Sequence, residues 1–472
     1  MKIRNPRNGT YDYEMLVDTV ESLVQKEEEL RAAQTDWNTK GIAFRVSVVQ
    51  DWIVQFQKHQ EEIAEQLSVD TARKRISEVE VKGILGLLHA WCYRAPQLLS
   101  PPEERPSASA SSVMIGQQWI PYSVVGVISP WNFPLLLALI DTVPALLAGC
   151  SVLLKPSEVT PRFMDGLEKS IQAIPELNKV LKICRGGAEV GKEVVNRADA
   201  ICFTGSVETG KKIAAACAAR FIPAFLELGG KDPAIVLDDA EMEITTDAVL
   251  RSAVGATGQA CQSLERIYAH ESIYDTFLKR LVAKAKAVTM TINPEKGQMG
   301  PLIFDKQAEK IQHHIDDAVA KGAKVLTGGK VENIEGGLWC PPTVISEVDH
   351  NMKVMTEETF GPLIPVMKFT EISEAIAYAN HGEFGLSASV FSADKQKALD
   401  ISYQIEAGAI SINDGSLTNK VYDAEKNSFK HSGIGGSRMG DAGFLRFFRK
   451  KALLFQTAAP ETMAHFEEDQ DA

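Results

Sequence analysis

The stretch AICFTGSVETG, residues 200–210, takes the chain from a short apolar run into a helical pattern. Residues 200–203 are typical of a buried strand, and a turn that contains glycine then leads into the helix. Such a turn leaves backbone N–H groups free at the start of the helix, where a pyrophosphate could approach. A lone Gly-x-x-x-x-Gly is weak evidence for this ligand, but the order strand, turn, helix indicates the fold class.

The same order recurs on both sides of this stretch. Strand candidates lie at 124–128, 151–154 and 234–237, with helical patterns between them, and a second alternating series runs from residue 244 to about residue 416. Strands that alternate with helices form parallel α/β layers, whose ligands bind beyond the carboxyl ends of the strands. The sequence therefore predicts an α/β fold with two such units.

Three other segments have a different character. Residues 13–99 carry charged side chains interleaved among apolar ones, which predicts helices and few strands. Residues 101–112 are rich in Pro, Ser, Ala and Glu, and 113–122 then has the pattern of extended chain, so we expect a boundary or a protruding arm. Residues 458–472 are acidic and poor in large apolar side chains, which predicts a solvated tail.

The composition excludes several functional classes. A length of 472 residues is too great for one core, and a formal charge of −12 opposes binding to nucleic acid. The seven cysteines include no Cys-x-x-Cys pair, so neither a disulfide framework nor a metal site is expected. The N-terminus lacks a signal-peptide core, and the most apolar stretch, 133–150, is broken by Pro134, Asp141 and Pro144. We expect a cytoplasmic protein that acts on a small molecule, away from membranes.

A candidate nucleophile and a candidate base stand in two short motifs. Cys261 ends Gly-Gln-Ala-Cys, and Glu227 opens Glu-Leu-Gly-Gly-Lys thirty-four residues (261 − 227) earlier. A cysteine attacks carbonyl carbon as a thiolate, so it needs a lowered pKa or a neighbour that accepts its proton. Without context, a buried structural cysteine and a surface glutamate would be the better interpretation.

Other polar residues follow the strand candidates. The amide of Asn132 could donate to an oxygen that becomes negative during attack at a carbonyl, although Asn is also common as a turn cap. Lys155 and Glu158 could bind ribose hydroxyls, or they could be ordinary charges at a strand end. The usual Gly-x-Gly-x-x-Gly is absent, and the acidic residue precedes Gly205 by forty-seven positions (205 − 158), so spacing alone leaves the cofactor open.

Six motifs in order give a resemblance that covers nearly the whole chain. They are Pro-Trp-Asn-Phe-Pro at 130–134, Lys-Pro-Ser-Glu at 155–158, Phe-Thr-Gly-Ser at 203–206, Glu-Leu-Gly-Gly-Lys at 227–231, Gly-Gln-x-Cys at 258–261 and Glu-x-Phe-Gly-Pro at 358–362. Together they resemble the NAD(P)-dependent aldehyde dehydrogenase superfamily, of the non-acylating type. The resemblance implies a Rossmann-like cofactor domain (1–104 and 123–229), an α/β catalytic domain (230–436), a small β oligomerisation arm (105–122 and 450–460) and an acidic tail (461–472).

The resemblance also implies a role for each matching residue. Cys261 would attack the aldehyde to give a thiohemiacetal, Asn132 and the backbone N–H of Cys261 would hold the oxyanion, and Glu227 would activate the water that hydrolyses the later thioester. A carboxylate at 158 accepts hydrogen bonds from a 2′-hydroxyl but repels a 2′-phosphate, which favours NAD over NADP. The implied cofactor residues are Trp131, Lys155, Glu158, Gly205, Ser206, Gly210, Glu358 and Phe360.

Departures from the family pattern bear on the substrate. Gly255 and Ala256 replace larger residues, and Phe133, Leu136, Leu137 and Ile140 recur at helical spacing on one face. That face could line a substrate tunnel together with Gly255 and Gln262, or it could be an ordinary core stripe. A tunnel of this kind suggests a bulky apolar or aromatic aldehyde.

Two further departures concern charge and assembly. Asp141 stands where many members have Lys, and Arg438 lies where their Gly-Arg-Glu stretch supplies a carboxylate, so we predict an Asp141–Arg438 ion pair. Residues 425–430 replace the usual Pro-Phe-Gly-Gly-x-Lys loop over the active site. The arm segments imply a homodimer or a homotetramer. A CoA-acylating or reductive enzyme, and an inactive binding or structural relative, remain alternatives, although Cys261, Glu227 and Asn132 are all present.

Overall fold

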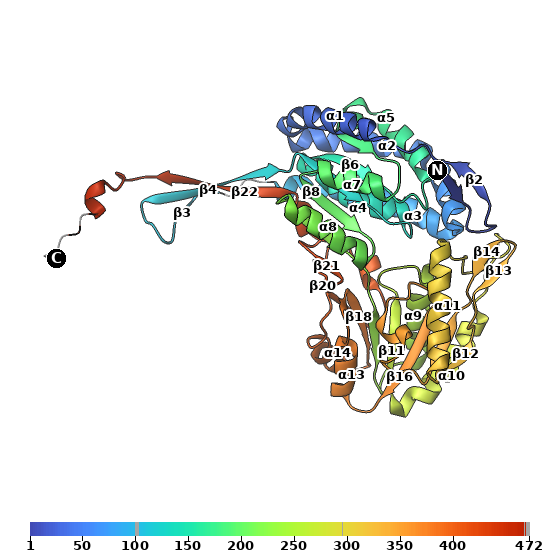
Figure 1. The fold of residues 1–472 in the computed structure, drawn as a ribbon. Helices are drawn as coiled ribbons and strands as arrows, with labels where there is room; N and C mark the ends of the chain where they lie inside the picture. The colour runs from blue at the N-terminus through green and yellow to red at the C-terminus, as the bar shows by residue number, and fades with distance from the viewer. Residues whose placement is uncertain (100–102, 295, 467, 469–472) are drawn as a thin grey trace.

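The computed structural model describes residues 1–99, 103–294, 296–466 and 468. Two bodies, each built on a sheet, lie one above the other, and a long arm projects from the upper body (Figure 1). Both sheets alternate with helices along the chain, as the sequence predicts. None of the helices in the described part of the chain combines the length and the apolar character needed to cross a bilayer.

The upper body contains a six-stranded sheet in the order β21-β9-β8-β5-β6-β7. Its central strands β5 (Val124–Ile128), β6 (Ser151–Lys155) and β8 (Ala200–Thr204) are buried along their whole length, which confirms three predicted strands. Pairing of Ile128 with Lys155 and of Thr204 with Glu227 brings the carboxyl ends of these strands to one edge. The remaining strands are β7 (Leu181–Ile183), β9 (Ala224–Glu227) and the antiparallel β21 (Gly433–Ile434).

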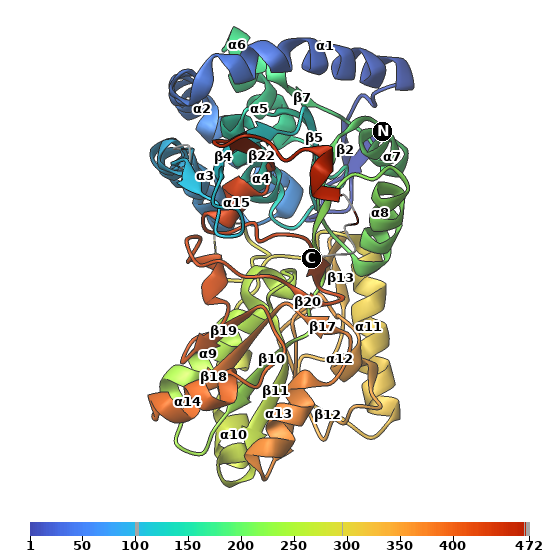
Figure 2. The same cartoon turned by 90° about the vertical axis from the view of Figure 1, so that its left-hand side faces the viewer.

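Helices cover both faces of this sheet, which explains why its strands are continuous apolar runs. One face packs against α2 (Gly41–Thr71), α3 (Lys74–Leu98) and α4 (Pro134–Ala148), and the other packs against α1 (Val20–Thr39), α7 (Ala188–Arg197) and α8 (Val207–Ala219). Figure 2 shows α2 and α3 on one side of this body and α7 and α8 on the other. The shorter helices are α5 (Phe163–Gln172), α6 (Pro175–Val180) and α15 (Ala442–Leu445).

The lower body contains a seven-stranded sheet in the order β12-β15-β16-β11-β10-β18-β19. All pairs are parallel except β12 with β15. The strands are β10 (Asp232–Val236), β11 (Leu264–His270), β12 (Lys324–Thr327), β15 (Thr343–Ser346), β16 (Leu363–Phe369), β18 (Ser387–Phe391) and β19 (Ala409–Ile412). The helices are α9 (Met242–Val254), α10 (Glu271–Ala287), α11 (Asp305–Ala320), α12 (Lys353–Thr356), α13 (Ile372–Asn380) and α14 (Lys395–Ser402).

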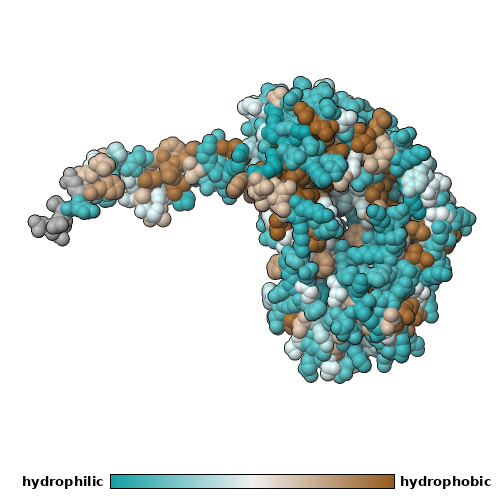
Figure 3. Space-filling view, viewed as in Figure 1, coloured by the Kyte–Doolittle hydropathy of each residue, from teal (hydrophilic) through white to brown (hydrophobic). Residues whose placement is uncertain are grey.

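The connection between the two sheets positions the functional residues. The chain leaves β9 at Glu227 and enters β10 at Asp232, so only four residues separate the strands. The carboxyl edge of the upper sheet therefore meets the amino edge of the lower sheet. Polar residues that follow upper strands and residues that precede lower strands come together at this junction, and the molecular surface is hollowed where the bodies meet (Figure 3).

The arm is a three-stranded sheet of β22 (Phe448–Gln456), β4 (Val113–Pro121) and β3 (Arg105–Pro106). Phe448 pairs with Pro121 and Gln456 pairs with Val113, so the last strand begins two residues before the expected boundary at 450. Leu453, Leu454 and Phe455 are exposed on the arm, and apolar residues are visible along it in Figure 3. The predicted arm is therefore present as a β structure, while the oligomeric state stays a prediction.

Several short elements were not expected from the sequence. They are the strand pairs β1 (Lys2–Arg4) with β2 (Tyr11–Glu14), β13 (Glu332–Ile334) with β14 (Gly337–Trp339), and β17 (Phe384–Gly385) with β20 (Phe429–Lys430). Strands of two to four residues carry too little alternation to be recognised. In the expected acidic tail, residues 461–466 are exposed and include a 3₁₀ turn at Met463–Phe466, whereas 467 and 469–472 lie outside the described residues.

Candidate active site

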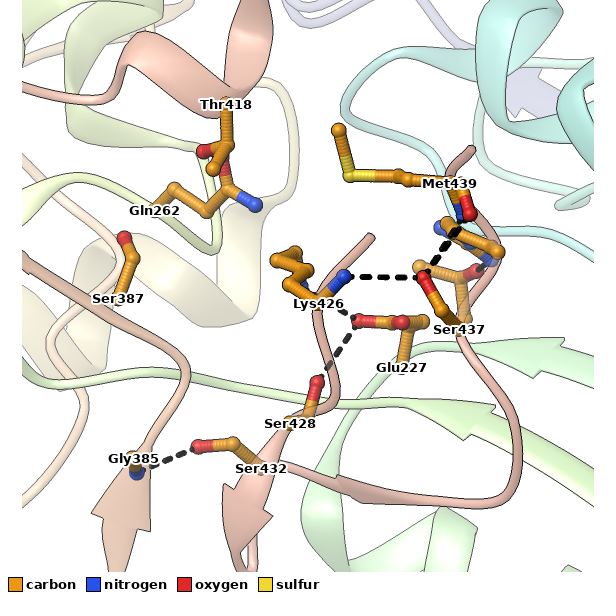
Figure 4. Close-up of polar contacts among 12 residues, drawn as sticks. Glu227, Gln262, Gly385, Ser387, Thr418, Lys426, Ser428, Ser432, Ser437 and Met439 are labelled. Atoms are coloured by element: carbon orange, nitrogen blue, oxygen red, sulfur yellow. Dashed lines mark hydrogen bonds and ion pairs between the residues drawn. The ribbon is translucent and has the colours of Figure 1, made fainter. Parts of the chain in front are cut away.

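Glu227 ends β9 and points its carboxylate toward a loop from the C-terminal part of the chain (Figure 4). The hydroxyl of Ser428 donates to Oε2 of Glu227 at 2.9 Å, and the ammonium of Lys426 lies 3.3 Å from the same oxygen. The side chains of Lys426 and Glu227 are only 4% and 13% exposed. Glu227 is therefore a largely buried carboxylate with a cationic partner that no motif predicted.

Cys261 lies in the turn between a strained 3₁₀ segment, Gly255–Gly258, and β11. Ala256, Thr257 and Gly258 all have left-handed φ values of 53°, 62° and 67°. A Cβ atom at Gly258 would lie 2.3 Å from the carbonyl oxygen of Gly361, so this position requires glycine. The strained turn presents the Cys261 side chain at the junction, where it is partly exposed, whereas the other cysteines of the described chain are buried.

The surroundings of Cys261 oppose ionisation of its thiol. Burial raises its pKa to about 12, and the carboxylates of Asp232, Glu227 and Glu358 act in the same direction. The ammonium of Lys426 acts against them and lowers the pKa. The resting thiol is consequently neutral at physiological pH, and it must lose its proton as it attacks.

Asn132 reaches the cysteine turn from the upper sheet. Its amide nitrogen donates to the carbonyl oxygen of Gln259 at 3.0 Å, two residues before Cys261 in the chain. The guanidinium of Arg73 donates to the carbonyl oxygen of Asn132 and to that of Ala256, at 3.4 Å in the second case. Arg73 thus ties both sides of the junction together, and it was not among the predicted residues.

Glu358, Phe360 and Trp131 form another part of the site. The backbone N–H of Gly230 donates to the Glu358 carboxylate at 3.1 Å, and burial followed by the charge of Glu265 raises the pKa of Glu358 to about 7. The N–H of Phe360 donates to Glu265 at 2.8 Å, and its ring meets the Trp131 ring edge-on at a centroid distance of 5.4 Å. The structure therefore brings these three predicted residues together, with Glu265 as an unpredicted support.

The carboxyl edge of the upper sheet carries groups that fit a dinucleotide. Lys155 is buried and its ammonium lies 2.8 Å from the Glu158 carboxylate, whose side chain is 35% exposed. The hydroxyl of Ser129, directly after β5, is buried without a hydrogen-bond partner. The backbone N–H of Ser129 donates to the carbonyl of Lys155 at 3.1 Å, so the orphaned hydroxyl and the partly exposed carboxylate belong to neighbouring strand ends. Such groups suit the hydroxyls of a ribose.

The turn before α8 provides the second part of this edge. A Cβ at Gly205 would lie 2.4 Å from the Phe203 ring, so glycine allows a close approach of backbone there. Ser206 caps the helix by accepting from the N–H of Thr209. The N–H of Gly210 donates to the Ser206 carbonyl inside the helix, and a Cβ at Gly210 would lie 2.6 Å from Leu228. Gly205 and Ser206 therefore lie at the open helix start, while Gly210 permits packing on Leu228.

The predicted tunnel residues differ in exposure. Phe133, directly before α4, and Leu136 and Leu137 on α4 are partly exposed, while Ile140 is buried. The carbonyl of the Gln262 side chain accepts from the Thr418 hydroxyl, and both residues lie across from Lys426 in Figure 4.

Gly255 does not line the same space as the other predicted tunnel residues. It lines a pocket of about 610 Å³ beside α9, together with Leu250, Val254 and Met299. The described lining of this pocket does not include Cys261 or any other predicted tunnel residue. The structure therefore does not place Gly255 with the other predicted tunnel residues, and its role as a tunnel residue is not supported.

The predicted ion pair between Asp141 and Arg438 is confirmed. Their closest oxygen and nitrogen lie 2.8 Å apart, and Asp141 is 1% exposed. Arg438 also donates to the Thr204 hydroxyl at 2.5 Å, and Arg446 makes a second ion pair with the same carboxylate. The sequence did not predict Arg446, because it lies beyond the family motifs.

Comparisons with known proteins agree with this architecture. Residues 1–453 match the model of the aldehyde dehydrogenase family. A protein of Mycolicibacterium smegmatis, named "Putative succinate-semialdehyde dehydrogenase" with NADP⁺ specified, is 31% identical over 449 residues, which cover 93% of this chain and 85% of that relative.

Solved structures show the same similarity. The "Putative Aldehyde Dehydrogenase PutA" from Anabaena variabilis is 47% identical, with a TM-score of 0.96 over 98% of both chains. Betaine aldehyde dehydrogenase from Staphylococcus aureus in complex with NAD⁺ is 30% identical, with a TM-score of 0.91 over 98% of this chain and 92% of that chain. This chain belongs to the aldehyde dehydrogenase family and is an oxidoreductase that acts on aldehydes.

Proposed function

We propose that the protein oxidises an aldehyde to the carboxylic acid with NAD, through a thioester on Cys261. The observation that carries this proposal is that a half-buried cysteine, a largely buried carboxylate and a buried amide, those of Cys261, Glu227 and Asn132, lie together where β9 runs into β10. These are the groups that acyl transfer through a cysteine requires.

In the first step, the sulfur of Cys261 bonds to the aldehyde carbon. Since the resting thiol is neutral, a base must accept its proton, and we assign Glu227, whose charge acts on this thiol. The carbonyl oxygen gains negative charge, and we assign the Asn132 amide, which donates to the Gln259 carbonyl beside the cysteine turn, as a donor to it. Loss of a single oxyanion donor typically slows such chemistry by about 10²- to 10³-fold.

Oxidation follows, and a bound nicotinamide supplies the hydride acceptor. Glu227 then releases its first proton to solvent and takes another from a water that attacks the thioester carbon. The carbon–sulfur bond breaks, the carboxylic acid leaves, and the departing sulfur takes the proton from Glu227, which restores both the thiol and the carboxylate. Because Glu227 supplies a base for water, acid should form without CoA.

NAD is the proposed cofactor because we assign the Glu158 carboxylate to the hydroxyls of the adenosine ribose, the group that carries the 2′-phosphate in NADP. Its carboxylate would repel that phosphate, although the neighbouring Lys155 at 2.8 Å offsets part of the charge. The M. smegmatis relative is named for NADP⁺ and the S. aureus structure holds NAD⁺, so a direct comparison of the two cofactors is the deciding test.

The proposed substrate is a bulky apolar or aromatic aldehyde. The partial exposure of Phe133, Leu136 and Leu137 supports a lining role for this face of α4, because a fully packed stripe would be buried.

The test is a panel of short aliphatic, anionic, long-chain and aromatic aldehydes, assayed for NADH formation and for the acid product without CoA. We expect the highest kcat/KM with aromatic or long-chain aldehydes, and no activity in Cys261→Ala. A preference for short anionic semialdehydes would contradict the substrate, and activity that depends on CoA would contradict hydrolysis.

A further inference from the structure

Lys426 is a buried cation in the loop where this chain departs from its family pattern. Its side chain is 4% exposed and its ammonium lies 3.3 Å from Oε2 of Glu227. The hydroxyl of Ser428, two residues later, donates to the same oxygen at 2.9 Å. One short loop segment therefore supplies two donors to a single oxygen of the proposed base (Figure 4).

The backbone around Lys426 is also fixed. Its N–H donates to the hydroxyl of Ser437 at 3.2 Å, and that hydroxyl donates to the carbonyl of Met439 at 3.1 Å. Pairing of Gly433 with Glu227 joins the following strand to β9. The loop that carries Lys426 is thus anchored at Ser437 and, through Gly433, on β9. Lys426 is therefore a buried residue in a fixed segment.

Lys426 is one of several charged groups that surround the Cys261 thiol. The carboxylates of Glu227, Asp232 and Glu358 all act on Cys261. Of the cations nearby, Arg438 is already paired with Asp141 at 2.8 Å. Lys426 is the cation in contact with Glu227, and its charge also acts on Asp232 and Cys261.

We propose that Lys426 is a positioning residue that holds the Glu227 carboxylate oriented to accept a proton. An ammonium and a hydroxyl on the same oxygen fix the direction of the carboxylate, whereas removal of one partner of a buried pair leaves the other charge uncompensated. Lys426 itself neither gains nor loses a proton in this role. When water attacks the thioester, one water proton passes to Glu227, the oxygen bonds to carbon, and the sulfur of Cys261 leaves.

This inference rests on the proposed role of Glu227, and Lys426→Met tests it by leaving a similar volume without charge. The steady-state kcat for NADH formation should fall by about 10- to 100-fold, because the Glu227 carboxylate would no longer be held toward the proton that it accepts. Lys426→Arg, which keeps the charge, should restore kcat.

Lys430→Met is a matched control in the same loop. The Lys430 ammonium donates to the backbone carbonyl of Asn380 at 2.6 Å and pairs with Glu406 at 2.9 Å. We expect Lys430→Met to keep the wild-type kcat. A folded Lys426→Met protein with an unchanged kcat, or a loss of kcat that Lys426→Arg does not restore, would overturn the inference.

A double variant separates this inference from the proposed function. If Lys426 acts through Glu227, Lys426→Met should cause no further loss of kcat in a Glu227→Gln protein, whereas independent structural damage would multiply the two losses. Full activity of Glu227→Gln, or no NADH from the wild type with any aldehyde, would instead contradict the proposed function.

Discussion

Cys261 is chemically unusual for a proposed nucleophile, because its surroundings raise its pKa to about 12. A raised pKa means that the thiolate is scarce at neutral pH and becomes populated only as the pH rises. We therefore predict that iodoacetamide modifies Cys261 at pH 7 at least about tenfold more slowly than a free cysteine, with a rate that increases steadily to pH 10.

Mass spectrometry of the peptide that contains Cys261 measures this rate, and Cys261→Ala shows the background from other sites. Rapid modification at pH 7 that stays constant up to pH 10 would contradict a neutral resting thiol.

Glu158 should control the choice between NAD and NADP. Replacing it in Glu158→Gln removes a negative charge while Lys155, now unpaired at that carboxylate, remains to attract a 2′-phosphate. We expect the ratio of kcat/KM for NADP to that for NAD to rise by about tenfold, a gain of roughly 1.4 kcal/mol. Glu189→Gln, an exposed carboxylate in α7, is the control, and an unchanged ratio in Glu158→Gln would contradict the cofactor assignment.

The site residues that could not be predicted from the sequence were missed for one physical reason. Cys261, Glu227 and Asn132 stand in short contiguous motifs, so they were recognisable one motif at a time. Lys426 acts on Glu227 from 199 positions away, and its loop fits no family pattern. Only the fold brings such a pair together, and the one signal for Lys426 was the departure of residues 425–430 from the expected loop.

At the scale of elements, the buried ion pair between Asp141 on α4 and Arg438 ties this helix to the C-terminal segment. Asp141 contacts both Arg438 and Arg446, so Asp141→Asn would leave two buried guanidinium groups without a countercharge. We expect a loss of about 3–5 kcal/mol in stability, seen as a clear fall in the melting temperature. The exposed pair of Asp36 and Lys40 provides the control: Asp36→Asn should change the stability by less than about 1 kcal/mol. Equal effects of the two substitutions would contradict a structural role for the buried cluster.

The strained turn before Cys261 offers a second comparison between elements. At Gly258, a Cβ would meet the backbone of Gly361 and the φ of 67° disfavours other residues, whereas a Cβ at Gly255 meets nothing within 4 Å. Gly258→Ala should therefore cost about 1–3 kcal/mol, and Gly255→Ala should cost little. Thermal unfolding measures both, and an undisturbed Gly258→Ala protein would show that the turn carries no strain.

Alternation along the chain predicted most large elements because long strands and helices have strong periods. The predicted strand at 234–237 appears as β10 at Asp232–Val236, and 151–154 appears as β6 with one more residue. The antiparallel β21 escaped prediction, since Gly433–Ile434 has two residues and takes its place through pairing with β9. Sheet order was likewise not deducible, because it depends on contacts between distant segments.

For the whole molecule, the exposed apolar residues of the arm indicate a surface that contacts another copy of the chain. Leu454 is 68% exposed and stands beside Leu453 and Phe455 on β22. We predict a homodimer or a homotetramer in solution, measured as molar mass by light scattering during gel filtration. Leu454→Asp should shift the distribution toward smaller species, while Tyr403→Asp, an equally exposed position away from the arm, should not. A wild-type monomer at all concentrations would contradict this role of the arm.

The central claim is that oxidation passes through an acyl group on Cys261 that Glu227 then releases with water. The most direct measurement is mass spectrometry of Glu227→Gln after an acid quench, following reaction with NAD and the best aldehyde of the panel. Because Glu227 also takes the thiol proton in the first step, NADH should form slowly in this variant. The account predicts that NADH and an acyl mass on the Cys261 peptide rise together to one equivalent, and that both disappear in the double variant with Cys261→Ala. Steady acid formation by Cys261→Ala, or an acyl group found on another residue, would contradict it.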